Sequence, residues 1–325
     1  MAKFPSEKRD ESRIMIVKRS DKKIIIENRF KYISNYLQSD DILIYNSTKV
    51  SKRRVYLYTE NSRKHEVVFL EKLLTGLWKC LIRNSGKLKE NAKLFSENKK
   101  YSFVYSRDSQ NLYLNPNQEM TEEIFDEIGN IPIPPYMRRE ATKEDEVRYQ
   151  TIFAKNPGSV AAPTAGLHFT DELKSDLINK GIIFSEVNLE VGYGTFAPLE
   201  KEQIENKRLH LENYYISDET AKLLNSRKKE SRVISIGTTS LRALESGMDE
   251  NKKFRSGSFQ TEIFIQPGDR IDSIDGLVTN FHLPESSLLM LVCAFGGTEL
   301  IMEAYNKAIK ENFRFYSYGD AMLII

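Results

Sequence analysis

Hydrophobic and polar positions change their spacing along this chain, and the alternation is clearest in the second half. From about residue 150, short apolar runs predict buried strands, and longer stretches with apolar residues three or four apart predict helices. The expected strands are 182–189, 232–236 and 261–266, and the expected helices are 171–180, 217–229, 241–246, 286–295 and 298–311. Regular alternation of this kind is typical of a layered, mixed α/β domain.

The segment from about Val55 to Ile133 has a different character. Runs such as HEVVFLEKL, LWKCLI and YSFVYS alternate with Asn, Ser, Gly and Lys, and only 121–127 predicts a turn of helix. This pattern predicts a small all-β unit, either a barrel or a sandwich. The prolines of 131–136 predict an extended exit from that unit, because proline fixes its own φ and restricts the preceding residue.

A buried strand is also predicted at 41–45, before the all-β segment. We expect this strand to join the later sheet, so that the all-β unit is an insertion. The predicted organisation is a discontinuous main α/β domain, 1–54 with 151–325, and an inserted domain, 55–150. A chain of 325 residues is long enough for two domains.

Composition excludes several classes of protein. The longest unbroken apolar run, 288–295, has eight residues, whereas a membrane span needs about twenty. The first residues, MAKFPSEKRDESR, lack the apolar stretch of a signal peptide. Two cysteines, Cys80 and Cys293, are too few for a disulfide framework or a cysteine-rich zinc site. We expect a reducing, cytoplasmic location and no metal.

Charge is distributed unevenly along the chain. The formal net charge is +2, but residues 1–54 hold 14 Lys and Arg against 7 Asp and Glu. A basic segment on a nearly neutral protein fits a polyanionic partner such as nucleic acid. A solvated basic face explains the same composition.

Two glycine-containing segments suggest ligand binding. GSVAAPTAGLHFT (158–170) places small residues around His168 just before a helix start, where an anionic group is favoured. The alternative is a tight structural crossover with a buried histidine. VGYGTFAPL (191–199) follows a strand and suits a nucleotide-binding turn, but it lacks the full dinucleotide fingerprint, so an ordinary turn explains it too.

Other segments carry histidines, hydroxyls or carboxylates. On a strand, His210 and Glu212 would share a face as an acid–base pair or as an exposed ion pair. GTTSLRALES (237–246) presents hydroxyls and amides at a helix start, while Arg242 and Glu245 would form a simple surface pair. His282 lies in a loop before an apolar core helix. The aromatic and polar residues of 314–324 either line a cleft or close the fold.

Taken together and in this order, these segments resemble the S-adenosylmethionine:tRNA ribosyltransferase-isomerase family of queuosine biosynthesis. The resemblance runs from about Arg9 to the C-terminus. It is carried by RDESRIMIV, DDILIYNSTKV, IPIPPYMRR, RYQTIFAKNPGSVAAPTAGLHFT, VGYGTF, IGTTSLRALES, TNFHLPESSLLMLVCAFGG and RFYSYGDAMLI. It implies a layered mixed α/β main domain with an inserted small β-barrel domain.

The resemblance also implies a reaction on tRNA that carries 7-aminomethyl-7-deazaguanine at the wobble position. The ribosyl part of S-adenosylmethionine is transferred to the aminomethyl group and isomerised, giving epoxyqueuosine-tRNA, while adenine and methionine leave. S-adenosylmethionine is then a consumed substrate, and no bound cofactor or metal is implied. We expect a monomer without membrane association.

Such chemistry needs a base near the acidic hydrogens beside the sulfonium and an acid near the departing adenine. The catalytic candidates, without individual roles, are His168, His210, Glu212 and His282, which we expect to line one hollow between the two modules. The candidates for binding the substrate are Thr164, Gly192, Gly194, Thr238, Thr239 and Arg242, with Tyr136 and Phe281 as stacking aromatics. Thr164, Thr238, Thr239 and Arg242 would hold the ribose hydroxyls and the methionine carboxylate.

Phosphate contacts to an anticodon loop need basic side chains, and such binding weakens steeply with salt. The candidates are Arg9, Arg13, Lys49, Lys52, Arg53, Arg54, Arg138 and Arg139.

The chain departs from the usual family pattern at several positions, including Lys49, Glu190, Lys207 and Asp269. These departures leave a catalytically weakened, tRNA-binding relative as an alternative. An ordinary methyltransferase is a second alternative, but its glycine-rich first strand–turn–helix is missing, and it would produce S-adenosylhomocysteine.

Overall fold

The computed structural model describes residues 2–192, 199 and 201–325, and within these it separates two compact units. The larger unit comprises 1–49, 150–156 and 162–325, and the smaller comprises 50–149 and 157–161. Residues 50–54 and 157–161 therefore pack with the smaller unit, whereas the sequence analysis assigned them to the main domain.

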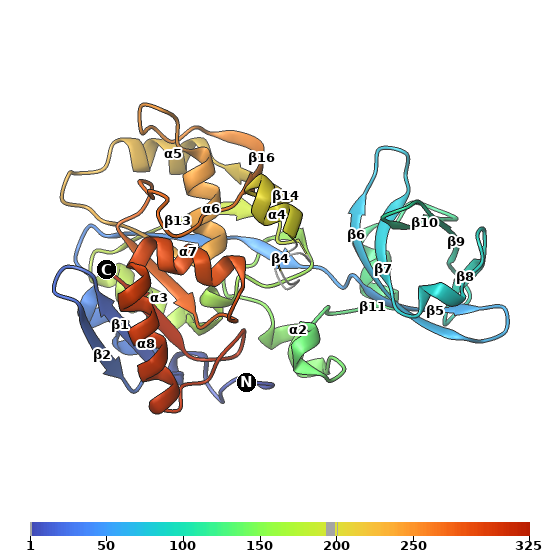
Figure 1. Cartoon of the computed structure of the whole chain (residues 1–325), viewed down its shortest axis with the longest axis horizontal. Helices are drawn as coiled ribbons and strands as arrows, with labels where there is room; N and C mark the ends of the chain where they lie inside the picture. Colours follow the sequence, from blue (N-terminus) through green and yellow to red (C-terminus); the bar gives the residue numbers. More distant parts are fainter. Residues whose placement is uncertain (1, 193–198, 200) are drawn as a thin grey trace. The chain divides into compact units, whose positions relative to one another are not determined.

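A mixed sheet forms the centre of the larger unit, with nine strands among the described residues (Figure 1). In spatial order they are β16 (Gly257–Ile263), β14 (Arg208–Ile216), β13 (Ile183–Leu189), β3 (Ile42–Asn46), β15 (Val233–Ile236), β17 (Gly276–Asn280), β18 (Ala321–Ile324), β1 (Ile14–Lys18) and β2 (Lys23–Glu27). The strand expected at 41–45 is β3, which pairs in parallel with β13 and β15. The prediction that it joins the later sheet is confirmed.

The strand directions bring several chain segments to one edge of this sheet. The strands β13, β3, β15 and β17 run parallel, so their carboxyl ends lie together. Ala321, the first residue of β18, pairs with Asn280 at the end of β17 and with Ile14 at the start of β1. The residues just before β1 and β18 therefore share this edge, which we call the carboxyl edge. In open α/β sheets, ligands bind outside the carboxyl ends of the parallel strands.

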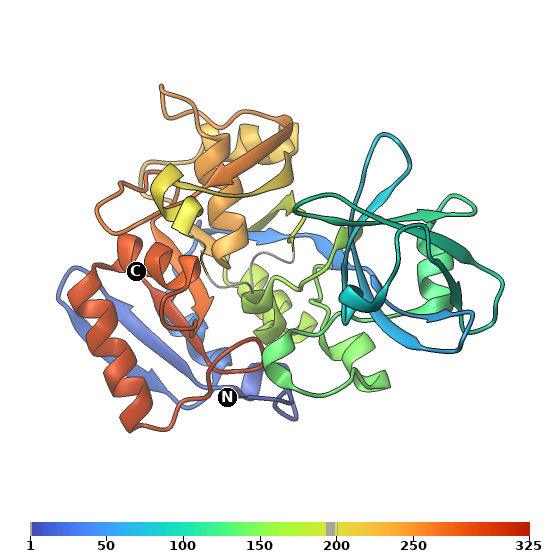
Figure 2. The ribbon, with the colours of Figure 1, turned by 45° about the vertical axis from the view of Figure 1, so that its right-hand side comes forward.

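Helices cover both faces of the sheet. On one face, α3 (Asp171–Asn179) and the 3-10 helix η2 (Phe30–Tyr36) pack onto β3, β15 and β18 in a single apolar cluster. The opposite face carries α6 (Thr238–Gly247), α7 (Ser287–Gly296) and α8 (Thr298–Lys310), and Figure 2 shows α8 lying along β1. Among the described residues, no single helix is long and apolar enough to span a membrane; α7 and α8 together meet the length and composition test, but they bend by 116°.

Two predicted helices have different bounds in the structure. The helix expected at 217–229 is α5 (Asp218–Asn225), because Ser226 and Arg227 turn their side chains back onto the carbonyls of Lys222 and Leu224. The helix expected from 241 begins at Thr238, because Gly237 adopts a φ of +95° and reverses the chain directly after β15. Of the predicted strand 261–266, only 261–263 lie in a strand, β16, which begins earlier, at Gly257. The strands β1, β2 and β17 were not predicted.

The smaller unit is a closed β-barrel (Figure 2). Around it run β5 (Arg54–Thr59), β6 (Lys64–Lys72), β7 (Trp78–Ile82), β10 (Leu112–Pro116), β9 (Ser102–Arg107) and β8 (Lys93–Ser96), and β8 pairs back with β5. Its core is rich in aromatic side chains, and α1 (Glu122–Ile128) contributes Phe125 to it. The predicted all-β unit is therefore a barrel rather than a sandwich, and the predicted fold class is confirmed.

Short elements complete the two units. These are the 3-10 helices η1 (Arg9–Glu11), η3 (Ser85–Lys87), η4 (Pro135–Met137) and η5 (Thr164–His168), the helices α2 (Lys143–Arg148) and α4 (Lys201–Asn206), and the strands β4 (Thr48–Val50), β11 (Gly129–Asn130) and β12 (Asn156–Ser159).

The start of α3 offers a direct test of local structure. Thr170 caps this helix, because its hydroxyl accepts a hydrogen bond from the Leu173 amide at 3.1 Å. We expect Thr170→Ala to lower the free energy of unfolding by about 1 kcal/mol and Thr170→Ser to restore most of it. Chemical denaturation of the three proteins measures the difference; equal stability of Thr170→Ala and the parent chain would contradict the assignment of the cap.

Candidate functional site

His168 is held from both sides at the carboxyl edge. Its Nδ1 lies 2.7 Å from the hydroxyl of Ser12, and its Nε2 lies 3.1 Å from the side-chain amide nitrogen of Asn280. Because the Asn280 amide can only donate there, Nε2 accepts, and Nδ1–H donates to Ser12. The Ser12 hydroxyl in turn donates to the Arg9 carbonyl oxygen at 3.3 Å. One histidine thus connects the segment before β1 with the end of β17.

The surroundings of His168 keep its ring neutral. The side chain is 4% exposed and its ring stacks on Phe30, with centroids 5.0 Å apart. Burial, together with the positive charges of Arg314 and Arg9, lowers the pKa of His168 to about 3. Since both ring nitrogens are engaged and the ring stays neutral, His168 is suited to positioning its neighbours rather than to moving a proton. The structural alternative, a buried histidine in a tight crossover, describes this position.

His282 lies two residues beyond the end of β17 and is half-buried. Its Nε2 is 2.8 Å from the Thr279 hydroxyl, and its backbone amide donates to the Tyr305 hydroxyl at 2.8 Å. Burial lowers the pKa of His282 to about 4, so its imidazole is neutral at neutral pH. Nδ1 of this ring has no hydrogen-bond partner within the described part of the chain. A neutral imidazole with a free lone pair can accept a proton.

Glu212 and Arg242 form a buried ion pair at the same edge. Arg242 Nη1 lies 2.5 Å from Glu212 Oε2, and the two side chains are 6% and 5% exposed. The other carboxylate oxygen of Glu212 accepts a hydrogen bond from the Gly192 amide at 3.3 Å. The sequence analysis had instead paired Glu212 with His210 and Arg242 with Glu245. Glu245 instead accepts hydrogen bonds from the backbone amides of Asp272 and Ser273.

The first turn of α6 adds hydroxyl groups beside this pair. Thr238 and Thr239 are buried, and the Thr239 hydroxyl has no hydrogen-bond partner among the described residues. Positions 239 and 242 are three apart on the helix and therefore share a face. Thr164 is half-buried in η5. The next residue, Ala165, lies close to Gly237.

His210 does not join these groups. The β14–β16 register shifts between Arg208 and Glu212, which breaks the two-residue alternation expected for a regular strand. As a result, Glu212 is buried while His210 is exposed, and among the described residues His210 has no hydrogen-bond partner. The prediction that His210 and Glu212 share a face as an acid–base pair is wrong.

The remaining candidates for substrate binding differ in their surroundings. Phe281 is fully buried, with its ring against Tyr305, Phe313 and Phe315, so it belongs to the core rather than to a stacking surface. Tyr136 lies in the smaller unit, on η4. Gly194 lies outside the described residues.

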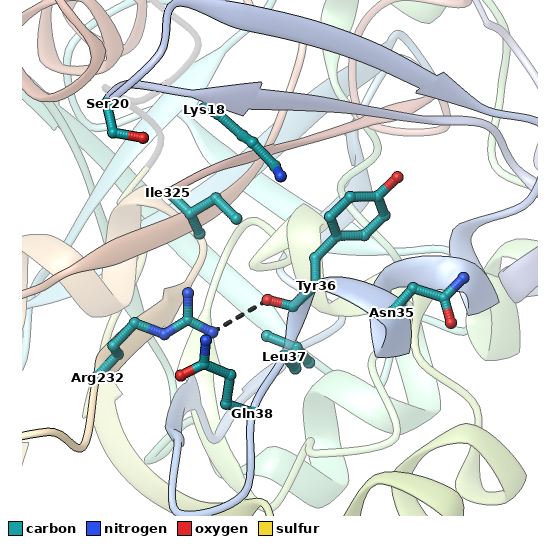
Figure 3. Close-up of a pocket in the computed structure, with 8 residues that line it drawn as sticks. All are labelled: Lys18, Ser20, Asn35, Tyr36, Leu37, Gln38, Arg232 and Ile325. Atoms are coloured by element: carbon teal, nitrogen blue, oxygen red, sulfur yellow. Dashed lines mark hydrogen bonds between the residues drawn. The ribbon is translucent and has the colours of Figure 1, made fainter.

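A pocket of about 310 Å³ lies at the opposite edge of the sheet (Figure 3). It is formed around Lys18, Tyr36 and Arg232, where β1 ends and β15 begins. Arg232 is already bound there by Asp41, through contacts of 2.9 and 2.6 Å, and by the Tyr36 carbonyl oxygen at 3.0 Å. None of the sequence-based candidates belongs to this pocket. Across the described residues, no group of three His, Cys, Asp or Glu side chains gathers to hold a metal ion.

Comparison with known proteins gives the family. The family model described as queuosine biosynthesis protein matches residues 1–324. The chain belongs to this family. Among its relatives, S-adenosylmethionine:tRNA ribosyltransferase-isomerases of Thermosipho melanesiensis and Fusobacterium nucleatum are 42% and 41% identical to this chain. The alignments cover 100% and 98% of this chain and 96% and 92% of those relatives.

A solved structure is also similar. The crystal structure of an S-adenosylmethionine tRNA ribosyltransferase from Thermotoga maritima, at 2.00 Å resolution, is 32% identical in sequence with a TM-score of 0.55. The match covers 100% of this chain and 96% of that one. The resemblance noted from the motifs is confirmed at the level of the family.

Most of the basic residues proposed for tRNA make contacts within the chain itself. Arg13 donates to the carbonyl oxygens of Glu311 and Asn312 at the end of α8. Arg53 pairs with Glu122, Arg54 with Glu66, Lys52 with Glu146 and Arg139 with Asp145. Arg9 is half-buried and donates to the Leu167 carbonyl oxygen, whereas Lys49 and Arg138 are exposed.

The residues that depart from the usual family pattern have different surroundings in the structure. The Glu190 carboxylate accepts a hydrogen bond from the Asn213 side chain at 3.0 Å, and that of Asp269 accepts from the Gln266 amide at 2.8 Å. Lys207 has a φ of +52° just before β14. Lys49 lies exposed on β4.

Sequence reasoning missed several residues at the carboxyl edge. Ser12, Asn280 and Tyr305 position His168 and His282, yet none of them lies in a motif with a known chemical pattern. The C-terminal segment closes the fold, because Asp320 accepts hydrogen bonds from the backbone amides of Arg13 and Arg314. Only the pairing of β1 and β17 with β18 places these residues together.

Proposed function

We propose that this chain is an S-adenosylmethionine:tRNA ribosyltransferase-isomerase of queuosine biosynthesis. The observation that carries the proposal is identity of about 40% to relatives of that name along nearly the whole of both chains. The polar groups gathered at the carboxyl edge of the larger unit support it, because ligands bind at this edge in α/β sheets. We propose the same reaction as for the family: ribosyl transfer to 7-aminomethyl-7-deazaguanine in tRNA, isomerisation to the epoxycyclopentane, and release of adenine and methionine.

His282 is our candidate for the proton acceptor. The Thr279 hydroxyl donates its hydrogen to the Asn280 carbonyl oxygen at 3.4 Å. Its oxygen can therefore accept a hydrogen bond from His282 Nε2–H. The lone pair then belongs to Nδ1. A base in this position would remove a hydrogen beside the sulfonium, which acidifies that carbon. His168, with both nitrogens engaged, would hold the Ser12 and Asn280 segments in place.

Product analysis tests this function. We expect adenine and methionine to appear in equal amounts when the protein meets S-adenosylmethionine and tRNA carrying the aminomethyl base, and neither product without the tRNA. His282→Ala is expected to slow adenine release by about 100-fold or more while leaving the thermal midpoint close to that of the parent chain. Chromatography of the small products measures the release of adenine and methionine, and thermal denaturation measures the midpoint. S-adenosylhomocysteine as the product would contradict the ribosyltransferase assignment, and a parental rate in His282→Ala would remove His282 from the chemistry.

A further inference from the structure

The guanidinium of Arg242 is only partly used by the protein. Nη1 contacts Glu212, but Nε and Nη2 are buried and have no hydrogen-bond partner among the described residues. An unpartnered N–H group shielded from water costs about 1–3 kcal/mol. Two such groups on one charged side chain that is 6% exposed therefore mark a place where an additional acceptor is expected.

The geometry of arginine defines that acceptor. Nε and Nη2 form one edge of the planar guanidinium, and a carboxylate fits such an edge with two parallel hydrogen bonds. The same chain shows this arrangement elsewhere: Arg232 uses its Nε and Nη2 to bind the two carboxylate oxygens of Asp41 at 2.9 and 2.6 Å. Arg242 offers the same edge, and no described carboxylate occupies it.

Glu212 supplies the opposite charge beside this edge. Within the described residues, its Oε2 contacts Arg242 without a well-directed hydrogen bond, and its Oε1 receives one long hydrogen bond, from the Gly192 amide. A Cβ built on Gly192, whose amide donates to this carboxylate, would meet no described atom within 4 Å. A cationic group entering there would find a buried anion.

We propose, building on the proposed function, that Arg242 and Glu212 bind the amino-acid end of S-adenosylmethionine. The α-carboxylate pairs with the Nε–Nη2 edge of Arg242, and the α-ammonium group lies against Glu212. Thr239 lies on the same helix face as Arg242, and its buried hydroxyl, which has no partner in the described part of the chain, donates to the same carboxylate. Glu212 thus changes from an acid–base candidate to a group that binds substrate.

Two nucleosides that differ only in the carboxylate test the proposal on the full chain. Decarboxylated S-adenosylmethionine keeps the sulfonium, the adenosine and the amino group. Isothermal titration is expected to give it a dissociation constant about 10- to 100-fold higher than that of S-adenosylmethionine, since hydrogen bonds to charged groups are among the strongest. Arg242→Lys keeps the charge and loses the two-pronged edge, so this ratio should fall close to one.

Two further variants separate the roles. Glu212→Gln should weaken both nucleosides alike, because both keep the ammonium group, and should leave the ratio as in the parent chain. Arg232→Lys changes the matching arginine at the opposite edge and should also leave the ratio unchanged. The comparison of the two nucleosides on the parent chain stands even if a variant fails to fold.

The outcomes distinguish this inference from the proposed function. Equal affinity of the parent chain for both nucleosides, together with tRNA-dependent adenine release, would overturn the inference alone. An unchanged ratio in a folded Arg242→Lys protein would also overturn it. Absence of both S-adenosylmethionine binding and adenine release would overturn the proposed function and the inference with it.

Discussion

Replacing Asp41 by asparagine is expected to lower the free energy of unfolding by about 3 kcal/mol. Asp41 is 1% exposed and receives hydrogen bonds from Arg232 and from the Gln38 amide at 2.7 Å. Removal of its charge leaves the partly buried guanidinium of Arg232 without its counter-ion, and this arginine joins the start of β15 to the loop before β3. Denaturant titration followed by circular dichroism measures the change.

The neighbouring residue provides a matched control. Asp40 pairs with Lys228 at 2.9 Å, but the two side chains are 46% and 70% exposed, so water screens the pair. Asparagine also tolerates the φ of +69° at this position. We expect Asp40→Asn to cost less than about 1 kcal/mol. Equal losses in the two variants would show that burial does not decide the strength of these ion pairs.

The stability of the protein is expected to fall in mild acid through His168. The pKa of this histidine is lowered to about 3 in the folded protein, from 6.5 as its ordinary value. Below pH 6.5 the unfolded chain binds a proton that the folded chain does not, so stability present above that pH is lost as the pH falls toward 3. The single group accounts for about 2 kcal/mol between pH 7 and pH 5.

His168→Gln isolates this contribution, because glutamine keeps hydrogen-bonding groups near Ser12 and Asn280 but does not titrate. We expect the variant to lose about 2 kcal/mol less than the parent chain over the same pH interval, whatever its stability at pH 7. Urea unfolding at pH 5, 6 and 7 gives both curves. Parallel curves for the two proteins would mean that His168 takes up a proton between pH 7 and pH 5 in the folded chain as it does in the unfolded chain, and its assignment as a neutral positioning group would fail.

The fold could be predicted further than the site. Alternating apolar runs place α3, β13 and β15, and the strand at 41–45 requires an inserted unit whatever its detailed shape. The pattern did not predict β1 and β2. Their apolar runs, IMIV and III, lie in the basic N-terminal segment, and only pairing with β18 and with each other shows that they complete the sheet.

The site depended on contacts that no local pattern reports. His210 and Glu212 are two residues apart, and a regular strand would put them on one face, but the irregularity in β14 separates them. Arg53 and Arg139 were chosen as basic side chains for phosphate contacts, yet each is bound by a carboxylate of its own unit. The chemical types of Glu212 and Arg242 were visible in the sequence. Their pairing across β14 and α6 required the three-dimensional structure.

The fate of the ribose tests the central claim most directly. We expect that, after incubation with S-adenosylmethionine labelled with carbon-13 throughout its ribose, mass spectrometry of the digested tRNA will find every labelled ribose carbon on the wobble nucleoside, with unlabelled adenine and methionine in solution. A tRNA that gains only the methyl group, with the labelled ribose left in S-adenosylhomocysteine, would contradict the account.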